Sequence, residues 1–292
     1  PVNEPVLSYA PGTPERTTLK AELERLSGTE IEMPLVIGDK AVTTGKLGTA
    51  TMPHAHAHVL GRFHLAGPAE IDAAIDAAVK AQPGWAGLPQ SARAAVFLKA
   101  ADLLATKYRP VLNAATMLGQ SKTAHQAEID AACELIDFFR FNVLFAERIL
   151  AEQPLSGPGM WNQVDARPLE GFVFAVSPFN FTSIAGNLPT APAILGNTAV
   201  WKPASTAAYS AHFIMQLLTE AGLPPGVINL VYGSGAAVGD RVIDSRHLAG
   251  VHFTGSTGVF QGMWRRVAER LDRYRTYPRL VGETGGKDFI FA

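Results

Sequence analysis

Between Gly171 and Ala292 the chain alternates short apolar runs with helical patterns, and this alternation constrains the fold more than any other feature. The apolar runs read GFVFAVS, TAVWKPA, INLVYG, GVHFTGS, RLVGE and DFIFA, and the connections between them are short. Short runs rich in β-favouring residues are typical of strands that are buried on both faces. Strands that alternate with helices form parallel sheets covered by helices. The sequence therefore predicts an α/β fold built on a parallel sheet.

The first of these strands ends in a turn that carries Asn180. Ser177-Pro178 ends the strand because proline has no N–H for the sheet, and Thr182 or Ser183 is the predicted N-cap of the next helix. Asn180 therefore follows the carboxyl end of a buried strand, where open α/β sheets bind their ligands. Its amide either donates a hydrogen bond to a ligand or stabilises its own turn.

Three more polar positions follow predicted strands. Lys202 can hold ribose hydroxyls or a phosphate, or can cap a loop. Ser256, in Phe253-Thr254-Gly255-Ser256, opens a helix whose free N–H groups can bind an anion. Glu283 is flanked by glycines, which suits either a carboxylate that changes position during a reaction or a solvated turn acid. The G-x-G-x-x-G fingerprint of ordinary dinucleotide folds is absent from the first strand-to-helix turn.

The first half of the chain is predicted to contain short strands and then helices. A helix is expected over residues 15–26, strand pieces over 33–65, and helices from residue 68, over 94–108 and over 123–150. The alternating His54, His56 and His58 share one strand face, which could seat a metal. Because no fourth ligand is nearby in the sequence, a polar strand face is the favoured interpretation. Cys133, on the third helix, is interpreted as a small buried hydrophobe.

Composition excludes several classes of protein. The net charge is −1, with no basic block that could follow a phosphate backbone, so we expect no nucleic-acid partner. No apolar run reaches the roughly 18 residues that span a bilayer, and residues 1–12 carry no secretion signal. The single cysteine excludes an internal disulfide and fits a reducing cytosol or matrix.

Four motifs, in this order and spacing, resemble those of the aldehyde dehydrogenase superfamily: SPFNF, WKPAS, FTGS and VGETGGK. Longer stretches resemble its 1-pyrroline-5-carboxylate dehydrogenase branch, and these are TMLGQSKTAHQAEIDAACELIDFFRFN, SPFNFTSIAGNLPTAPA, FTGSTGVF and LDRYRTYPRLVGETGGK. The resemblance implies a Rossmann-type, aldehyde dehydrogenase-like fold. It also implies oxidation of L-glutamate γ-semialdehyde to L-glutamate in proline catabolism, through a cysteine thioester, with NAD or NADP as cofactor.

The resemblance also implies roles for individual residues. Asn180 would donate to the oxyanion of the reacting aldehyde, and Glu283 would activate water against the thioester. Glu128 and Phe181 would contact the substrate's ammonium and aliphatic chain. Cofactor contacts are implied for Ser177, Pro178, Phe179, Lys202, Ser205, Gly235, Gly255 and Ser256, with Lys202 on the adenosine ribose and Ser256 on the pyrophosphate. No metal site is expected.

The chain departs from the superfamily pattern at three points. Phe260 stands where the superfamily often has glycine, as is common in the pyrroline-carboxylate branch. Ser205 stands where NAD-preferring members are often acidic, which leaves the choice between NAD and NADP open. The superfamily's catalytic cysteine lies downstream of Glu283, and Cys133 does not match it. We therefore expect a chain that stops before its catalytic domain and is inactive alone.

The predicted organisation has four parts: an N-terminal arm (1–34), a dinucleotide-binding domain (35–154 and 169–285), an oligomerisation hairpin (155–168) and the start of a catalytic domain (286–292). We expect a small-molecule aldehyde substrate, a homodimer or higher homo-oligomer, and a location in the cytoplasm, or in the mitochondrial matrix of a eukaryote. Two alternatives remain, namely a dehydrogenase for another semialdehyde and a non-catalytic nucleotide-binding module.

Overall fold

The computed structural model of the chain describes residues 1–286, 290 and 291, and within residues 1–286 the strands form two sheets. The larger has seven strands in the order β10-β9-β6-β7-β8-β2-β3. Its first five strands are parallel, while β2 and β3 add an antiparallel edge. These strands are β10 (Arg279–Thr284), β9 (Leu248–Gly255), β6 (Phe172–Ser177), β7 (Thr198–Pro203), β8 (Ile228–Leu230), β2 (Leu35–Ile37) and β3 (Lys40–Val42). The predicted parallel sheet is confirmed.

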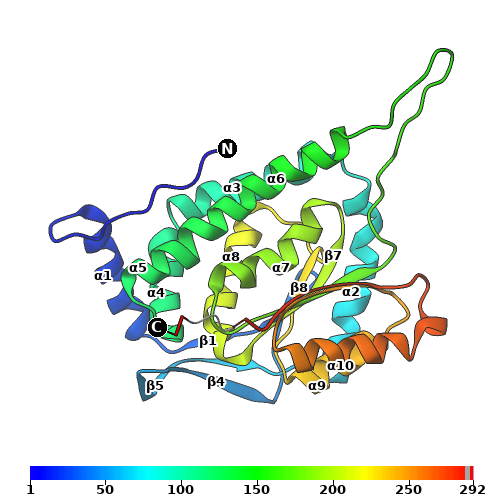
Figure 1. Cartoon of the computed structure of the whole chain (residues 1–292). Helices are drawn as coiled ribbons and strands as arrows, with labels where there is room; N and C mark the ends of the chain where they lie inside the picture. The colour runs from blue at the N-terminus through cyan, green and yellow to red at the C-terminus, as the bar shows by residue number, and fades with distance from the viewer. Residues whose placement is uncertain (287–289, 292) are drawn as a thin grey trace.

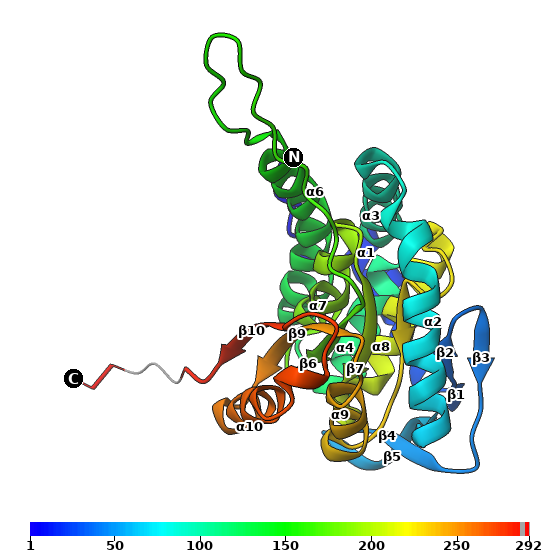
Figure 2. The ribbon, with the colours of Figure 1, turned by 90° about the vertical axis from the view of Figure 1, so that its right-hand side faces the viewer.

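The strand order reverses at β6, because the strands that follow it in sequence are added first on one side of it and then on the other. From β6 the chain steps to β7 and β8, and it then returns to β9 and β10 on the other side of β6. Because such crossovers are right-handed, the helices of the first series and those of the second lie on opposite faces of the sheet (Figure 2). The first series is α7 (Thr182–Ile194) and α8 (Ala208–Ala221), and the second is α9 (Gly235–Ile243) and α10 (Thr257–Ala268).

Further helices cover these two layers. On one side α2 (Pro68–Ala86) packs against β7, β8 and α9, while α3 (Gln90–Ala105) and α4 (Arg109–Gln120) pack on α8. Next to them α6 (Leu135–Ala151) packs on α7, and α1 (Pro14–Ser27) packs on α4 (Figure 1). The three-stranded sheet has the order β1-β5-β4, with β1 (Ile31–Met33), β5 (Ala55–His64) and β4 (Leu47–Met52).

The core lies between the large sheet and its helices. In β6 every residue but Val176 is buried, as expected of a strand covered on both faces. Among the largest fully buried side chains are Phe174 of β6, Trp201 of β7 and Tyr209 of α8. On the α3–α6 side the rings of Phe97 and Phe139 lie 6.3 Å apart.

The helices predicted over 15–26, from 68, and within the alternating second half are confirmed, but two other expectations need correction. The helix predicted over 94–108 ends at Ala105, and α4 was missed; Pro110 sits in its first turn, where a missing N–H costs no hydrogen bond. The helix predicted over 123–150 is three segments, α5 (Ala124–Ala127), a π-helix η1 (Glu128–Glu134) and α6.

Residues 155–168 leave the body of the protein as a long exposed excursion (Figures 1 and 2). The structure assigns no strand there, although Gln153 and Val164 exchange hydrogen bonds across its base. Leu155 and Trp161 are 93% and 85% exposed. Most of the predicted catalytic-domain start, 286–292, lies outside the described residues.

The described part of the chain contains no metal-binding group of three or more His, Cys, Asp or Glu side chains. Two of the alternating histidines contact protein groups: His54 Nδ1 lies 2.8 Å from Ser121 Oγ, and His58 Nε2 lies 2.8 Å from the Ser27 carbonyl. None of the described helices combines the length and the apolar character needed to cross a bilayer.

Candidate functional site

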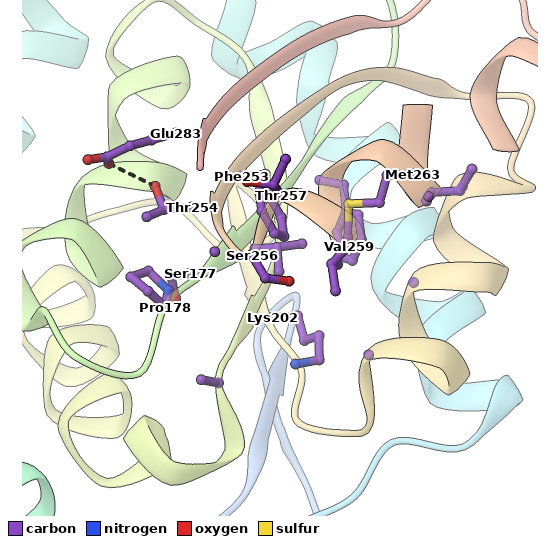
Figure 3. A pocket seen from close by; sticks show the side chains of 18 of the residues that line it. Ser177, Pro178, Lys202, Phe253, Thr254, Ser256, Thr257, Val259, Met263 and Glu283 are labelled. Atoms are coloured by element: carbon purple, nitrogen blue, oxygen red, sulfur yellow. Dashed lines mark hydrogen bonds between the residues drawn. The ribbon is translucent and has the colours of Figure 1, made fainter. Parts of the chain in front are cut away.

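A cleft of about 1280 Å³ opens at the carboxyl ends of β6, β7 and β9 (Figure 3). This is the point where the strand order reverses, which is where open α/β sheets bind ligands. Four separate stretches of the sequence meet there: 176–181, Lys202 and Ala204, 253–257, and Glu283 with Gly285 and Gly286. One side of α9, from Gly235 to Ile243, and one side of α10 complete its walls.

In the turn after β6 some residues are buried in the protein and others are exposed in the cleft. Ser177 is buried, and its hydroxyl accepts a hydrogen bond from Trp201 Nε1 at 3.0 Å. Phe179 and Asn180 are exposed and line the cleft. Within the described residues the Asn180 side chain makes no hydrogen bond, so it does not stabilise its own turn. Its amide is free to donate to a ligand.

The start of α7 differs from the prediction. The N-cap is Phe181, and neither Thr182 nor Ser183 caps the helix. Both of their N–H groups donate instead to the Asp130 carboxylate, each at 3.0 Å. The prediction was wrong because the capping acceptor comes from a segment 52 residues earlier in the chain.

Lys202 is a buried cation at the edge of the cleft. Its side chain comes from the end of β7, the residue is 7% exposed, and burial lowers its pKa. Nζ donates to the Pro203 carbonyl at 3.1 Å, and no carboxylate of the described chain pairs with it. A buried ammonium without a counter-ion favours an anionic or hydroxyl-rich ligand.

Two helix N-termini face the same cleft. Gly235 begins α9, where Ser234 Oγ accepts from the Ala237 N–H at 3.1 Å and leaves those of Gly235 and Ala236 without a capping bond from the described residues, and Ser256 is the N-cap of α10 with no side-chain capping bond. Free N–H groups and the helix dipole favour a phosphate at such positions. A Cβ at Gly255 would lie 2.7 Å from the Phe253 ring, so this strand end admits only glycine without displacement.

Glu283 lies on β10 opposite Thr254 of β9. Its carboxylate is exposed to the cleft and accepts a hydrogen bond from Thr254 Oγ1 at 3.3 Å (Figure 3). Gly285 and Gly286, just beyond the strand, have φ angles of 74° and 84°, a backbone conformation that glycine adopts without strain.

A second cleft of about 770 Å³ lies against the first, between α6, α7, β9 and β10. Its walls are largely aromatic and aliphatic, with Glu134 and Asp137 as acidic groups. Phe181 lines both clefts, as do Phe253, Thr254 and Glu283. Glu283 therefore lies at the boundary between the two clefts and is accessible from both.

Two predicted site residues lie elsewhere. Glu128 is fully buried, and its carboxylate is bound by Arg109, Tyr9, Asn113 and the Leu7 N–H. The prediction that it contacts substrate is wrong, because every one of these partners belongs to the arm or to α4 and none lines either cleft. Glu134, six residues later, lines the second cleft together with Asp137 and Glu283. Ser205 is exposed at the start of the 3₁₀ turn η2 (Ser205–Ala207) and does not line the cleft.

Cys133 is not an activated thiol. Its side chain is 6% exposed, and burial, reinforced by the Glu128 charge, raises its pKa to about 12. The sulfur lies 3.6 Å from Glu128 Oε1 and lines neither cleft. The interpretation of Cys133 as a buried structural residue is confirmed.

Comparisons with known proteins agree with this geometry. The aldehyde dehydrogenase family matches residues 43–292. A delta-1-pyrroline-5-carboxylate dehydrogenase of Agaricus bisporus is 52% identical over 289 residues, which cover 98% of this chain and 53% of that protein. The mitochondrial enzyme of that name from Mus musculus is 50% identical, with 99% of this chain and 51% of that protein covered. The chain thus spans about half the length of these relatives.

Solved structures give the same result. The delta-pyrroline-5-carboxylate dehydrogenase of Mycobacterium tuberculosis bound with NAD superimposes with a TM-score of 0.97 at 58% identity, covering 99% of this chain and 54% of that one. A 1-pyrroline-5-carboxylate dehydrogenase from Thermus with bound NAD superimposes with a TM-score of 0.89 at 31% identity, covering 98% of this chain and 55% of that one.

Proposed function

This chain belongs to the aldehyde dehydrogenase family, and we propose that it forms the cofactor-binding part of an enzyme that oxidises L-glutamate γ-semialdehyde to L-glutamate in proline catabolism. The observation that carries the proposal is the convergence on one cleft of the turn at 177–181, Lys202, the β9–α10 junction and Glu283. The names of the relatives support the substrate, and the two NAD-bound neighbours support the cofactor.

The cleft fits a dinucleotide. Lys202 offers an unpaired cation to ribose hydroxyls, and the N–H groups at Ser256 and Gly235 offer two donor sets to a pyrophosphate. Val259 and Met263 of α10 supply an apolar wall for a base. When bound, the nicotinamide supplies hydride acceptance. We include NADP as a second cofactor because Lys202 is the charged group at the ribose end of the proposed site and is positive.

The polar groups divide the reaction between them. Asn180 donates to the oxyanion that forms at the aldehyde carbon, a contribution worth about 2.7–4 kcal/mol where such donors have been removed. Glu283 removes a proton from the water that hydrolyses the thioester. The nucleophilic cysteine of this proposal lies outside the chain, because Cys133 is buried and protonated.

The second cleft is the proposed substrate side. Phe181 and its aromatic neighbours pack against the aliphatic chain, and Glu134 takes the place predicted for Glu128 as the partner of the ammonium group. The exposed apolar side chains of the excursion 155–168 support an oligomerisation role for it. The four-part domain organisation and a location in the cytosol, or in the mitochondrial matrix of a eukaryote, belong to the same proposal.

Binding of NAD to this chain, measured by calorimetry, tests the proposal. Lys202→Ala should raise the Kd by roughly ten- to a hundredfold, since a hydrogen bond from a charged group contributes about 1.5–3 kcal/mol. Lys107→Ala is the matched control, because Lys107 pairs with Glu220 on the surface, away from the cleft. Equal affinities for wild type and Lys202→Ala, or no NAD binding at all, would contradict the proposed site.

A further inference from the structure

The N-terminus of α7 is capped from outside by Asp130. This carboxylate comes from the π-helical segment η1 and is 2% exposed. Oδ2 accepts from the Thr182 N–H and Oδ1 from the Ser183 N–H, and Ser183 Oγ lies 2.8 Å from Oδ1. Asp130 therefore satisfies two of the first N–H groups of the helix, including that of Ser183, which an N-cap side chain could otherwise bind.

The external cap frees the N-cap position for another purpose. Serine, threonine, asparagine or aspartate at position 181 could accept from the N–H of Ser183 or Ile184 from within the turn. Phe181 occupies that position instead, is 38% exposed and lines both clefts. A buried carboxylate is a costly substitute for a local cap, since it must be removed from water and paired. Helix stability alone does not require this arrangement.

Lys122 contacts both the capping carboxylate and Phe181. Its ammonium lies 2.6 Å from Asp130 Oδ2 and 4.2 Å from the centre of the Phe181 ring. One cation thus neutralises the capping carboxylate and contacts the face of the aromatic ring between the clefts. Thr182 is held on its other side, where its hydroxyl contacts Thr116 Oγ1 at 2.8 Å and Gln120 Nε2 at 2.9 Å.

We propose that Asp130, with Lys122, is a positioning residue that fixes Asn180 and Phe181 for the reaction. Asn180 has no hydrogen bond of its own within the described residues, so its place depends on the anchored backbone two residues later. This inference rests on the proposed function, in which Asn180 is the oxyanion donor. Asp130 touches no reacting group and acts only through the turn that it holds.

A double-mutant cycle in the enzyme that contains this chain tests the inference. The rate of the first burst of reduced cofactor is measured for Asn180→Ala, Asp130→Ala and the double variant. Asn180→Ala should slow the burst by about 10²–10³-fold. Asp130→Ala should slow it by up to about 10²-fold, because a displacement near 1 Å has that effect. Asp130→Ala should slow the Asn180→Ala enzyme by a much smaller factor than it slows wild type, since the part of its effect that acts through Asn180 is already lost and only the part through Phe181 remains.

The controls distinguish a failure of the Asp130 inference from a failure of the proposed function. Glu128→Gln removes another buried carboxylate charge from the same π-segment without touching α7, so its effect should multiply with that of Asn180→Ala. If the two losses of Asp130→Ala and Asn180→Ala also multiply, Asp130 is merely structural and the inference is wrong. An unchanged burst in Asn180→Ala would instead overturn the proposed function. If Asp130→Ala does not fold, the cycle is run with Asp130→Asn, which keeps the volume and one acceptor oxygen, and the same outcomes decide.

Discussion

Replacing Gly282 with alanine should move the carboxylate of Glu283 without altering any polar group. An added Cβ would lie 2.5 Å from two ring carbons of Phe260, so the strand and the ring must separate by about 1 Å to reach an ordinary contact. Phe260 cannot yield easily, because it stacks on Phe253 at 5.6 Å and meets Trp264 edge-on at 5.8 Å. The strand β10 is the edge of the sheet and is the part expected to move.

The size of the effect follows from this geometry. Overpacking of a filled contact costs about 1–3 kcal/mol of unfolding free energy, which urea denaturation of this chain measures. Gly84→Ala is the matched control, since its Cβ meets nothing within 4 Å inside α2, and it should be stabilising by about 0.5–1 kcal/mol. In the enzyme that contains this chain, Gly282→Ala should also slow thioester hydrolysis.

A second substitution tests whether the contact with Phe260 is the cause. Phe260→Ala removes the ring that the new Cβ would meet, so Gly282→Ala should cost much less stability in that background than in wild type. If Gly282→Ala destabilises both backgrounds equally, the contact is not responsible and strain elsewhere must be sought. If Gly282→Ala is neutral in wild type, β10 is not held against α10 as described.

Three further outcomes are expected. Glu283→Gln should keep a rapid burst of reduced cofactor while steady turnover slows, whereas Asn180→Ala should suppress the burst itself. Stopped-flow fluorescence measures the burst. Its loss in both variants would mean that the carboxylate acts before thioester hydrolysis. Cys133→Ser should leave turnover nearly unchanged in the enzyme that contains this chain, and loss of activity in a folded variant would identify it as the nucleophile. Burial lowers the pKa of His212 from 6.5 to about 4, so the stability that its neutral form contributes is complete above pH 6.5 and is lost as the pH falls toward 4. His212→Gln should therefore flatten the fall in unfolding free energy between pH 7 and pH 4.5, and an unchanged slope would contradict this assignment.

The second half of the fold could be predicted from the sequence because its strands are short apolar runs and each is followed by a helical pattern. Neighbouring residues determine such elements. In β6, for example, the apolar run defines the strand and Ser177-Pro178 marks its end. The same local patterns predicted that Asn180, Lys202, Ser256 and Glu283 follow strands. Parallel pairing brings the ends of those strands to one edge of the sheet, so their meeting in one cleft follows from the fold.

The predictions that failed depended on contacts distant in sequence or on an unusual helix. The cap of α7 is Asp130, and no local pattern near Thr182 reveals a carboxylate 52 residues away. The substrate role of Glu128 was implied by the family resemblance, and the segment was predicted to be one regular helix over 123–150. The π-helical segment changes which side chains share a face, so that Glu128 points to the arm and Glu134 to the second cleft.

The position of β9 explains how one strand can serve two ligands. It lies beside β6 at the point where the strand order reverses, with α9 and α10 lining the first cleft and α6 and α7 lining the second. Phe253 and Thr254, at its end, line both clefts, and the β9–β10 register sets Glu283 directly opposite Thr254. A hydride acceptor in the first cleft and an aldehyde in the second would therefore meet across the width of a single strand end. In the proposed reaction the Glu283 carboxylate would activate water from this position, and its hydrogen bond to Thr254 Oγ1, at 3.3 Å, is long enough to be exchanged for one to water.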